Sequence, residues 1–202
     1  RAKVYPSETA ARSTGPCRPV ISMTEQNGSV VGDRSEYIIN ALREARNNRH
    51  PVTISAGDSK RHMAGRECEY TPLDISGHRG IVDYQPQELV ITARAGTPLQ
   101  EITAILQANN QILSFEPPLF DGRATLGGTL ACNLSGPARP WGGSIRDMVL
   151  GVQLINGKCE RLNFGGRVMK NVAGYDVSRL QAGALGTLGV VTEVSLKVLP
   201  QA

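Results

Sequence analysis

Aromatic residues are scarce in this sequence of 202 residues: three Phe, five Tyr and one Trp make up only 4% of it. Positive charge is not concentrated either, because 22 Lys and Arg are dispersed among 18 Asp and Glu and leave a net charge of +4. A nucleic-acid-binding domain needs a basic stripe and, for single strands, a platform of aromatic side chains. We therefore expect no nucleic acid among the partners of this protein.

Long apolar runs and paired cysteines are also missing. No window holds the roughly eighteen consecutive apolar residues that a membrane-spanning helix needs. The four cysteines, Cys17, Cys68, Cys132 and Cys159, form no C-x-x-C pair and have no histidine at zinc-ligand spacing. We therefore expect no membrane span, no metal site, and free thiols in a reducing compartment.

The first 22 residues lack hydrophobic periodicity and are rich in Ser, Thr, Pro and Arg. A segment of this composition buries too little apolar surface to fold by itself. We predict that residues 1–22 are a disordered leader and that residues 23–202 form the folded domain. An overall hydrophobic content of 40% is enough to build a core for it.

Residues 36–106 read as a helix, three strands and a second helix, and we expect a small parallel α/β lobe over residues 36–95. Apolar residues recur at helical spacing in residues 36–47. Thr97, Pro98 and Gln100 read as the N-cap, the first position and the capping partner of a second helix. Apolar runs predict strands at residues 51–56, 73–75 and 88–96.

Residues 96–202 carry antiparallel signals instead. Two apolar runs flank Asn156-Gly157, a dipeptide that favours a tight hairpin turn. Residues 190–200 alternate apolar and polar side chains, as a half-buried strand does. We therefore expect a larger, mainly antiparallel lobe with short helices, and a ligand cleft between the two lobes.

The first glycine-bearing interruption of the apolar pattern follows the strand predicted at residues 51–56. Gly57 would let backbone amides converge on an anion there, and Ser59 and Lys60 would add a hydroxyl group and a positive charge. The alternative is an ordinary turn at the end of a strand.

Residues 124–147 are the second interruption. Gly127 and Gly128 precede a short apolar helix whose free amides would attract phosphate. The alternative is a rigid connection between lobes, and the prolines and glycines of residues 135–143 predict an extended path.

The glycines of residues 182–191 do not have the G-x-G-x-x-G spacing, which excludes a Rossmann site. His50 and His78 lie in polar segments and are expected to be solvent-exposed groups.

Several motifs occur together in one order: GDSK (57–60), EPP (116–118), ATLGGTLACN (124–133), GSIRDMVLGV (143–152), MKNVAGYDVSRL (169–180) and GTLGVVTEV (186–194). In this order they resemble the FAD-binding domain of the vanillyl-alcohol oxidase / p-cresol methylhydroxylase (PCMH) superfamily. Within it, the sequence resembles the FAD-binding subunits of glycolate oxidase (glycolate dehydrogenase). The resemblance runs from residue 36 to residue 200. It implies an α+β fold, a PCMH-type two-lobed domain with FAD between the lobes.

The resemblance also implies a set of cofactor-binding residues. Ala56, Gly57, Asp58, Ser59 and Lys60 would form a pyrophosphate loop. The other residues implied are Thr125, Gly127, Gly128, Cys132 and Asn133 along the pyrophosphate, ribityl chain and flavin, Ser144 near the flavin or ribityl chain, Gly189, Val190 and Val191 by the adenine, and Pro118.

Non-covalent FAD is expected, because the loop reads Asp58-Ser59-Lys60 where some relatives carry an attaching histidine, and His62 lies slightly beyond. The Asp58 carboxylate is unfavourable beside a pyrophosphate unless a neighbouring cation offsets it. The catalytic residues are unknown. Lys170 is a weak candidate whose alternative role is to pair with a carboxylate or an FAD phosphate. Trp141 is expected to pack between the lobes or to stack on the flavin.

The function implied is that of an FAD-binding subunit that supports the oxidation of glycolate, a 2-hydroxy acid, to glyoxylate. It would be a flavin-dependent oxidoreductase acting on a CH–OH donor within a complex. Its partners would be a homologous FAD-containing subunit and an iron–sulfur subunit that takes the electrons. The alternative is an FAD-holding relay or assembly module without its own substrate site.

Location and extent are expectations of the same kind. We expect a cytoplasmic protein that partners could hold at the inner face of the cell membrane. Family members continue into a C-terminal substrate or cap domain, which we expect to be absent from this chain.

Overall fold

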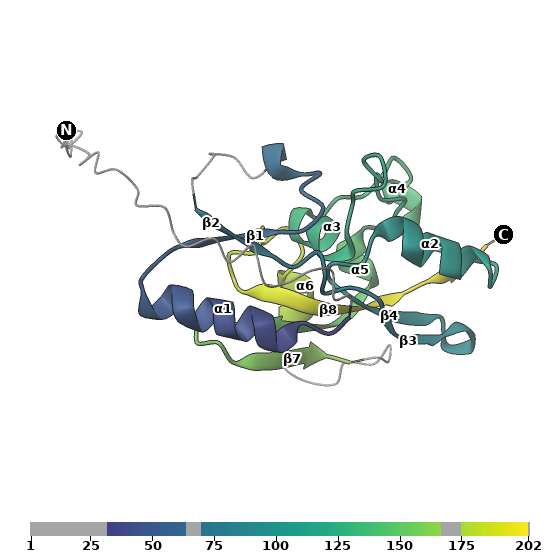
Figure 1. Ribbon diagram of the computed structural model, residues 1–202. Coiled ribbons are helices and arrows are strands. Elements are labelled where there is room, and N and C mark those ends of the chain that lie inside the picture. The colour runs from purple at the N-terminus through teal and green to yellow at the C-terminus, as the bar shows by residue number, and fades with distance from the viewer. Residues whose placement is uncertain (1–31, 64–69, 167–174, 202) are drawn as a thin grey trace, which may run out of the picture. The chain divides into compact units, whose positions relative to one another are not determined.

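The computed structural model describes residues 32–63, 70–166 and 175–201 and is drawn as a ribbon in Figure 1. The predicted leader at residues 1–22 lies outside the described residues, and so does Lys170. The described part of the chain is α+β, as the sequence predicts, because it combines a parallel and an antiparallel sheet with helices.

Helix α1 packs on a small parallel sheet, and the sequence predicts all three elements. Strands β1 and β2 pair in parallel, with Val52 opposite Thr71 at the start of the ladder. The buried face of α1 contributes Ile38 to an apolar cluster that also contains Leu73 of β2. The bounds are α1 Ser35–Asn47, β1 Val52–Ser55 and β2 Thr71–Asp74, with a short 3-10 helix, η2, at Arg61–Met63.

The main sheet has five strands in the order β3-β4-β8-β6-β7, and every neighbouring pair is antiparallel. The alternating run at residues 190–200 supplies its central strand, β8. The bounds are β3 Ile81–Gln85, β4 Val90–Arg94, β6 Val149–Ile155, β7 Arg161–Gly165 and β8 Val190–Lys197, with the 3-10 helix η3 at Pro86–Glu88 between β3 and β4.

The parallel pairing expected for the strands of residues 36–95 does not hold for strand β4. This strand was assigned to the parallel lobe, but it lies between β3 and β8 in the antiparallel sheet, with Ile91 opposite Leu196. Strand β3 was not predicted at all. A short apolar run shows that a strand is buried but not which strand it pairs with, because the partner here lies about a hundred residues away in the sequence.

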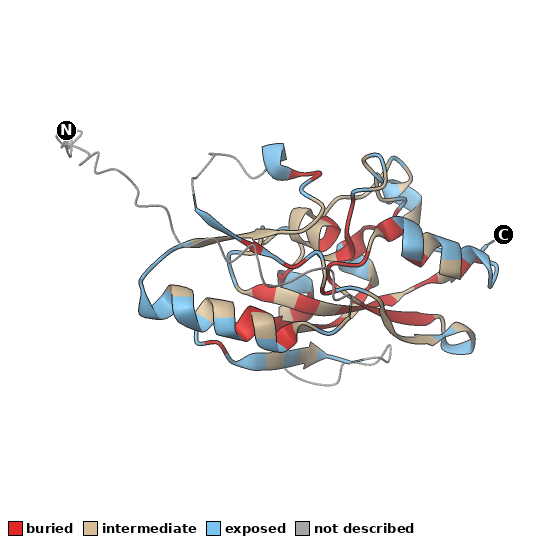
Figure 2. Ribbon diagram, viewed as in Figure 1, coloured by how far each residue is buried: buried red, intermediate tan, exposed pale blue. Residues whose placement is uncertain are grey.

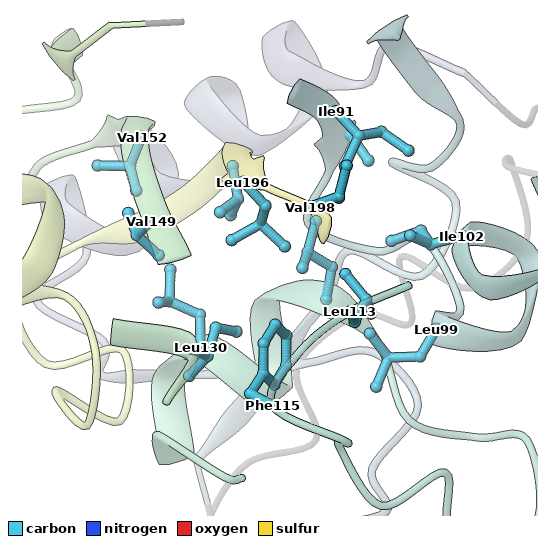
Figure 3. Close-up of a cluster of buried hydrophobic side chains, with 14 of the residues drawn as sticks. Ile91, Leu99, Ile102, Leu113, Phe115, Leu130, Val149, Val152, Leu196 and Val198 are labelled. Atoms are coloured by element: carbon cyan, nitrogen blue, oxygen red, sulfur yellow. The ribbon is translucent and has the colours of Figure 1, made fainter. Parts of the chain in front are cut away.

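The core lies between this sheet and helices α2, α3 and α5. Buried residues follow the central strands, whereas the outer face of α1 is exposed (Figure 2). Phe115 is fully buried and packs with Leu130 of α3 and Leu99 of α2 in the main apolar cluster (Figure 3). The remaining bounds are α2 Leu99–Gln107, α3 Leu126–Cys132, α4 Arg139–Gly142, α5 Ile145–Met148, α6 Val177–Leu180, and the paired strands β5 Gln111–Ile112 and β9 Leu199–Pro200.

Helix α2 begins without the predicted capping box. Its N-cap is Pro98, and no side chain caps the helix. The Thr97 side chain is fully buried and bonds to Gly80 instead: its Oγ1 accepts from the Gly80 N–H at 2.9 Å and donates to the Gly80 carbonyl at 3.3 Å. Thr97 therefore fixes the chain before β3, which a pattern local to residues 97–100 does not reveal.

The hairpin between β6 and β7 is confirmed, but its tight two-residue turn is not. Ile155 and Arg161 form the last pair, so the loop has the five residues between them. The Asn156 side-chain oxygen accepts from the N–H groups of Lys158 and Glu160, and Cys159 takes the left-handed conformation with φ of 62°. The side chain of Asn156 therefore organises a longer loop.

The extended path predicted for residues 135–143 is wrong for its second half, which forms helix α4. Pro140 occupies the first turn of this helix, where a missing N–H costs little. Trp141 is 86% exposed, so it does not pack as expected.

His78 is fully buried, which contradicts the expectation of a solvent-exposed group, whereas His50 is exposed as expected. The His78 Nδ1 accepts from the Arg34 N–H at 2.9 Å, and its Nε2 lies 3.1 Å from the Thr192 carbonyl oxygen. This side chain therefore links the start of α1 to strand β8.

Among the helices of the described residues, none combines the length and the apolar character needed to cross a bilayer. The same residues contain no cluster of three or more His, Cys, Asp or Glu side chains that could hold a metal ion.

Candidate functional site

A cleft of about 670 Å³ lies beside the end of β1, and its size suits a small-molecule or cofactor site. Its walls come from β1 and the turn after it, from the first and last turns of α3, and from residues 181–191. Apolar side chains such as Ile54, Leu185 and Val191 line one part of it, and polar groups of the turn line another.

The turn of residues 55–60 is held against the loop that precedes α3. A Cβ atom at Gly57 would overlap the carbonyl oxygen of Arg123, so only glycine fits this approach. Asp58 takes the left-handed conformation, with φ of 48°. The Ser55 hydroxyl donates to the Asp58 carboxylate at 3.0 Å, which gives that negative charge a protein donor of its own.

Lys60 is the cation of this turn, and its side chain is only 7% exposed. Its Nζ donates to the Ser59 hydroxyl at 3.2 Å and lies 5.3 Å from the centre of the Phe120 ring. Burial lowers the pKa of Lys60, because the charged form loses hydration. Among the described residues, no carboxylate pairs with this ammonium group.

A buried cation without a counter-ion is costly unless another group supplies the negative charge. The missing charge can come from a ligand, because Lys60 lines the cleft. The arrangement therefore favours an anionic ligand at this end of the cleft.

Helix α3 begins one residue before Gly127, so both glycines lie in its first turn. The N–H groups of Leu126, Gly127 and Gly128 donate to the Thr97 carbonyl, the Ala95 carbonyl and the Thr125 hydroxyl. The predicted free amides are therefore already bonded within the protein, and the expectation that they attract phosphate is not supported. Lys60 and Arg61 are the cations that line the cleft, and Lys60 is the buried one of the two.

The two glycines serve different purposes. At Gly127 a Cβ would lie 2.7 Å from the Ala95 Cβ, so this glycine allows the helix to approach strand β4. At Gly128 a Cβ would lie 3.1 Å from the Thr125 Oγ1 and 3.7 Å from the Lys60 Nζ. Gly128 therefore keeps the space beside Lys60 open.

The last turn of α3 supplies Cys132 and Asn133. Cys132 is a partly buried free thiol that lines the cleft, and burial raises its pKa. Asn133 caps the helix in the left-handed conformation, with φ of 51°. Its side-chain oxygen is buried and has no hydrogen-bond partner in the part of the chain that the structure describes.

Most of the predicted cofactor residues come together in this one cleft, although they are far apart in the sequence. The lining includes Ala56, Gly57, Asp58, Ser59, Lys60, Thr125, Gly127, Gly128, Cys132, Gly189 and Val191.

Four other predicted residues lie outside the lining, and two of them have a clear structural role. Ser144 caps α5, where its N–H and hydroxyl both donate to the Asp147 carboxylate. Val190 is 3% exposed and points into the cluster beneath α1. The remaining two are Pro118 and Asn133.

The cleft also contains residues that the motifs did not single out, among them Tyr70, Gln181 and Leu185. Gln181 is only 3% exposed although it is polar. It directly follows the MKNVAGYDVSRL motif, which is the one sequence signal that could have drawn attention to it.

Comparison with known proteins places these features in a family context. A family model described as "FAD binding domain" matches residues 29–179. The solved structure of an alkyldihydroxyacetonephosphate synthase superposes with a TM-score of 0.67 and 22% identity, over 82% of this chain and 30% of the other. At that identity, the likeness shows a shared fold.

Curated relatives are oxidoreductases of hydroxy acids by name. Glycolate oxidase subunit GlcE of Escherichia coli (strain K12) is 51% identical over 169 residues, which is 84% of this chain and 48% of that protein. A D-lactate dehydrogenase of Anaerostipes hadrus is 32% identical (63% of this chain, 26% of that protein), and glycolate oxidase subunit GlcD of Bacillus subtilis (strain 168) is 29% identical (75% and 33%). The chain thus spans about half or less of the length of these relatives.

Proposed function

This chain belongs to the FAD binding domain family, and on that premise we propose that its cleft beside Lys60 holds FAD. The prediction of FAD as the cofactor is confirmed by the family. The single observation that supports this location is the buried Lys60 ammonium group, which lines the cleft and pairs with no described carboxylate. A diphosphate supplies the charge that this group lacks.

Different parts of the lining would hold different parts of the cofactor. Lys60 and the Ser59 hydroxyl would bind the diphosphate, and the space kept open by Gly128 would let it approach. The apolar wall around Ile54 and Val191 would hold a flat ring and exclude water from it. When bound, FAD supplies two-electron redox chemistry at its flavin ring. We propose that it is held non-covalently, since no histidine is among the lining residues that the structure describes.

The reaction proposed for the whole protein is the oxidation of glycolate to glyoxylate. The carbon that carries the hydroxyl group becomes a carbonyl carbon: the C–H and O–H bonds break, and the CH–OH group gives up two electrons and two protons, the electrons going to FAD. The similarity to glycolate oxidase subunit GlcE over 84% of this chain supports the assignment. Lys170 remains a proposal for a catalytic role.

Assembly and location are part of the same proposal. The names GlcE and GlcD describe subunits of a glycolate oxidase, which supports a homologous FAD-containing partner. We propose that electrons then pass to an iron–sulfur subunit and that the complex is cytoplasmic, or peripheral at the inner face of the cell membrane.

A second candidate function is an FAD-holding module that relays electrons without a substrate site of its own. One observation favours it: among the described lining residues, Asp58 is the only carboxylate and there is no histidine, so the cleft has no evident acid–base pair. Anaerobic addition of glycolate to the FAD-loaded chain separates the two functions. Bleaching of the flavin band supports a substrate site, and bleaching only after a partner is added supports the module.

The site itself is tested by replacing the cation. Lys60→Met keeps the aliphatic stem and should weaken FAD binding by about 10- to 100-fold, since a hydrogen bond to a charged group contributes about 1.5–3 kcal/mol. The matched control is Lys158→Met, in the exposed β6–β7 loop, which should bind FAD like the unsubstituted chain. The measurement is titration of flavin fluorescence. Equal FAD affinity of the two variants would refute the site, and failure of the unsubstituted chain to bind FAD would refute the function.

A further inference from the structure

The loop of residues 116–123, which leads toward α3, carries a strained backbone beside the cleft. Glu116, Phe120 and Asp121 have φ values of 45°, 47° and 55°. The left-handed region is unfavourable for residues with a Cβ atom, and it persists only where the surroundings fix the chain. The contacts that this loop makes should therefore hold its backbone in the strained conformation.

The loop is fixed from two sides. Its own turn is closed by the Arg123 N–H donating to the Phe120 carbonyl and the Ala124 N–H donating to the Leu119 carbonyl, both at 3.1 Å. On the cleft side, the Arg123 carbonyl packs directly against Gly57, with no room for a Cβ atom. The loop and the turn that contains Lys60 are therefore held together through their backbones.

This arrangement brings the Phe120 ring to the ammonium group of Lys60, with 5.3 Å between the ring centre and Nζ. The ring is partly buried and packs against the main apolar cluster, which limits its movement. The face of an aromatic ring attracts a cation but accepts no strong hydrogen bond. One N–H group of the Lys60 ammonium donates to the Ser59 hydroxyl, and the others thus stay available for a ligand.

We propose that Phe120 is a positioning residue for Lys60, whose ammonium group its ring holds at the wall of the cleft. The role toward FAD rests on the proposed function, because it requires the cofactor diphosphate to accept from Lys60. An aliphatic side chain would fill the same space without attracting the cation. The flexible stem of Lys60 would then lose a restraint, and ordering it would oppose ligand binding.

The first test concerns Lys60 in the full chain without cofactor. Replacing Phe120 with 3,4,5-trifluorophenylalanine keeps the shape of the ring and removes most of its attraction for a cation. The rate of reductive methylation of Lys60, followed by mass spectrometry, should rise at least about threefold, in line with a lost cation–π contact. Lys158 in the same sample is the internal reference and should react at an unchanged rate. An unchanged rate at Lys60 would overturn the proposal whether or not the chain binds FAD.

The second test concerns FAD affinity. Phe120→Leu and the trifluorinated ring should each weaken binding by about 3- to 30-fold, the range from an exposed to a desolvated cation–π contact. Phe120→Tyr keeps an electron-rich ring and should bind FAD like the unsubstituted chain. Phe164→Leu, a partly buried aromatic of β7 outside the lining, is the matched control and should bind normally.

A double-mutant cycle separates positioning from a general structural role. In a Lys60→Met background, Phe120→Leu should have no further effect on FAD affinity, because the cation that the ring holds is gone. Equal losses in both backgrounds would mean that Phe120 supports the cleft only as a packing residue, which overturns the inference. If the unsubstituted chain fails to bind FAD, the proposed function fails, and the methylation rate still decides the role of Phe120.

Discussion

From the burial of His78 we predict how the free energy of unfolding changes with pH. Burial lowers its pKa below the ordinary value of 6.5, and the nearby guanidinium group of Arg94 acts in the same direction, as does that of Arg161. The Asp33 carboxylate, 3.8 Å from Nδ1, opposes this effect without reversing it. His78 is therefore neutral in the folded chain at pH 7, with Nδ1 as an acceptor for the Arg34 N–H.

Proton linkage gives the direction in which pH changes the free energy of unfolding. Below pH 6.5 the unfolded chain binds a proton at this residue and the folded chain resists it, so the free energy of unfolding falls as the pH falls. Between pH 7.5 and pH 5.5 this loss is at most about 1.4 kcal/mol, the limit for a group that binds its proton only in the unfolded chain. The carboxyl groups with lowered pKa values, Asp33 and Asp147, have ordinary values of 3.8 and act at lower pH.

The assay is urea unfolding at both pH values for the unsubstituted chain, His78→Gln and His50→Gln. His78→Gln should be less stable by about 1–3 kcal/mol at pH 7.5, because its amide cannot satisfy both buried partners equally well. It should also lack the loss between pH 7.5 and pH 5.5. His50→Gln, at an exposed residue, should keep that loss. Retention of the full pH dependence by His78→Gln would show that His78 is not the group responsible for it.

Two further predictions concern stability and cofactor binding. Gly57→Ala should lower the free energy of unfolding by more than about 2 kcal/mol and weaken FAD binding, because its Cβ would overlap a backbone carbonyl of the adjoining loop. The control is Gly157→Ala, whose Cβ would lie in open space. It should change the free energy measured in the same urea unfolding by less than about 0.5 kcal/mol. Ser144→Ala should cost about 1 kcal/mol as a lost cap but leave the FAD affinity measured by fluorescence unchanged, because this hydroxyl lies outside the cleft. A large loss of FAD affinity in the Ser144 variant would show that the lining extends further than the cleft described.

The sequence anticipated those parts of the fold that depend on local periodicity. Helix α1 and strand β8 follow from apolar spacing that is visible within a dozen residues, and both are present. The order of the glycine-bearing motifs was equally informative, since it indicated the FAD-binding family that the comparison confirms. Most of the cofactor-binding residues that these motifs imply also line the cleft.

Side-chain roles that depend on distant partners were not predictable in this way. Thr97 reads as a helix cap, but in the structure it bonds to Gly80, seventeen residues away. His78 reads as a loop residue, but it bonds to Thr192 of β8, 114 residues away, and to the Arg34 N–H at the start of α1. Such contacts are missed because a residue type shows what a side chain can bond to but not which group the fold brings to it.

The family, the cofactor and most of the secondary structure follow from the sequence alone, because spacing and motif order are properties of the chain. The folded structure was needed to show that β4 belongs to the antiparallel sheet, that the first amides of α3 are already bonded, and that Lys60 is buried without a described carboxylate partner. The physical reason is the same in each case. Strand pairing, burial and charge compensation are set by groups that are distant in sequence and meet only when the chain has folded.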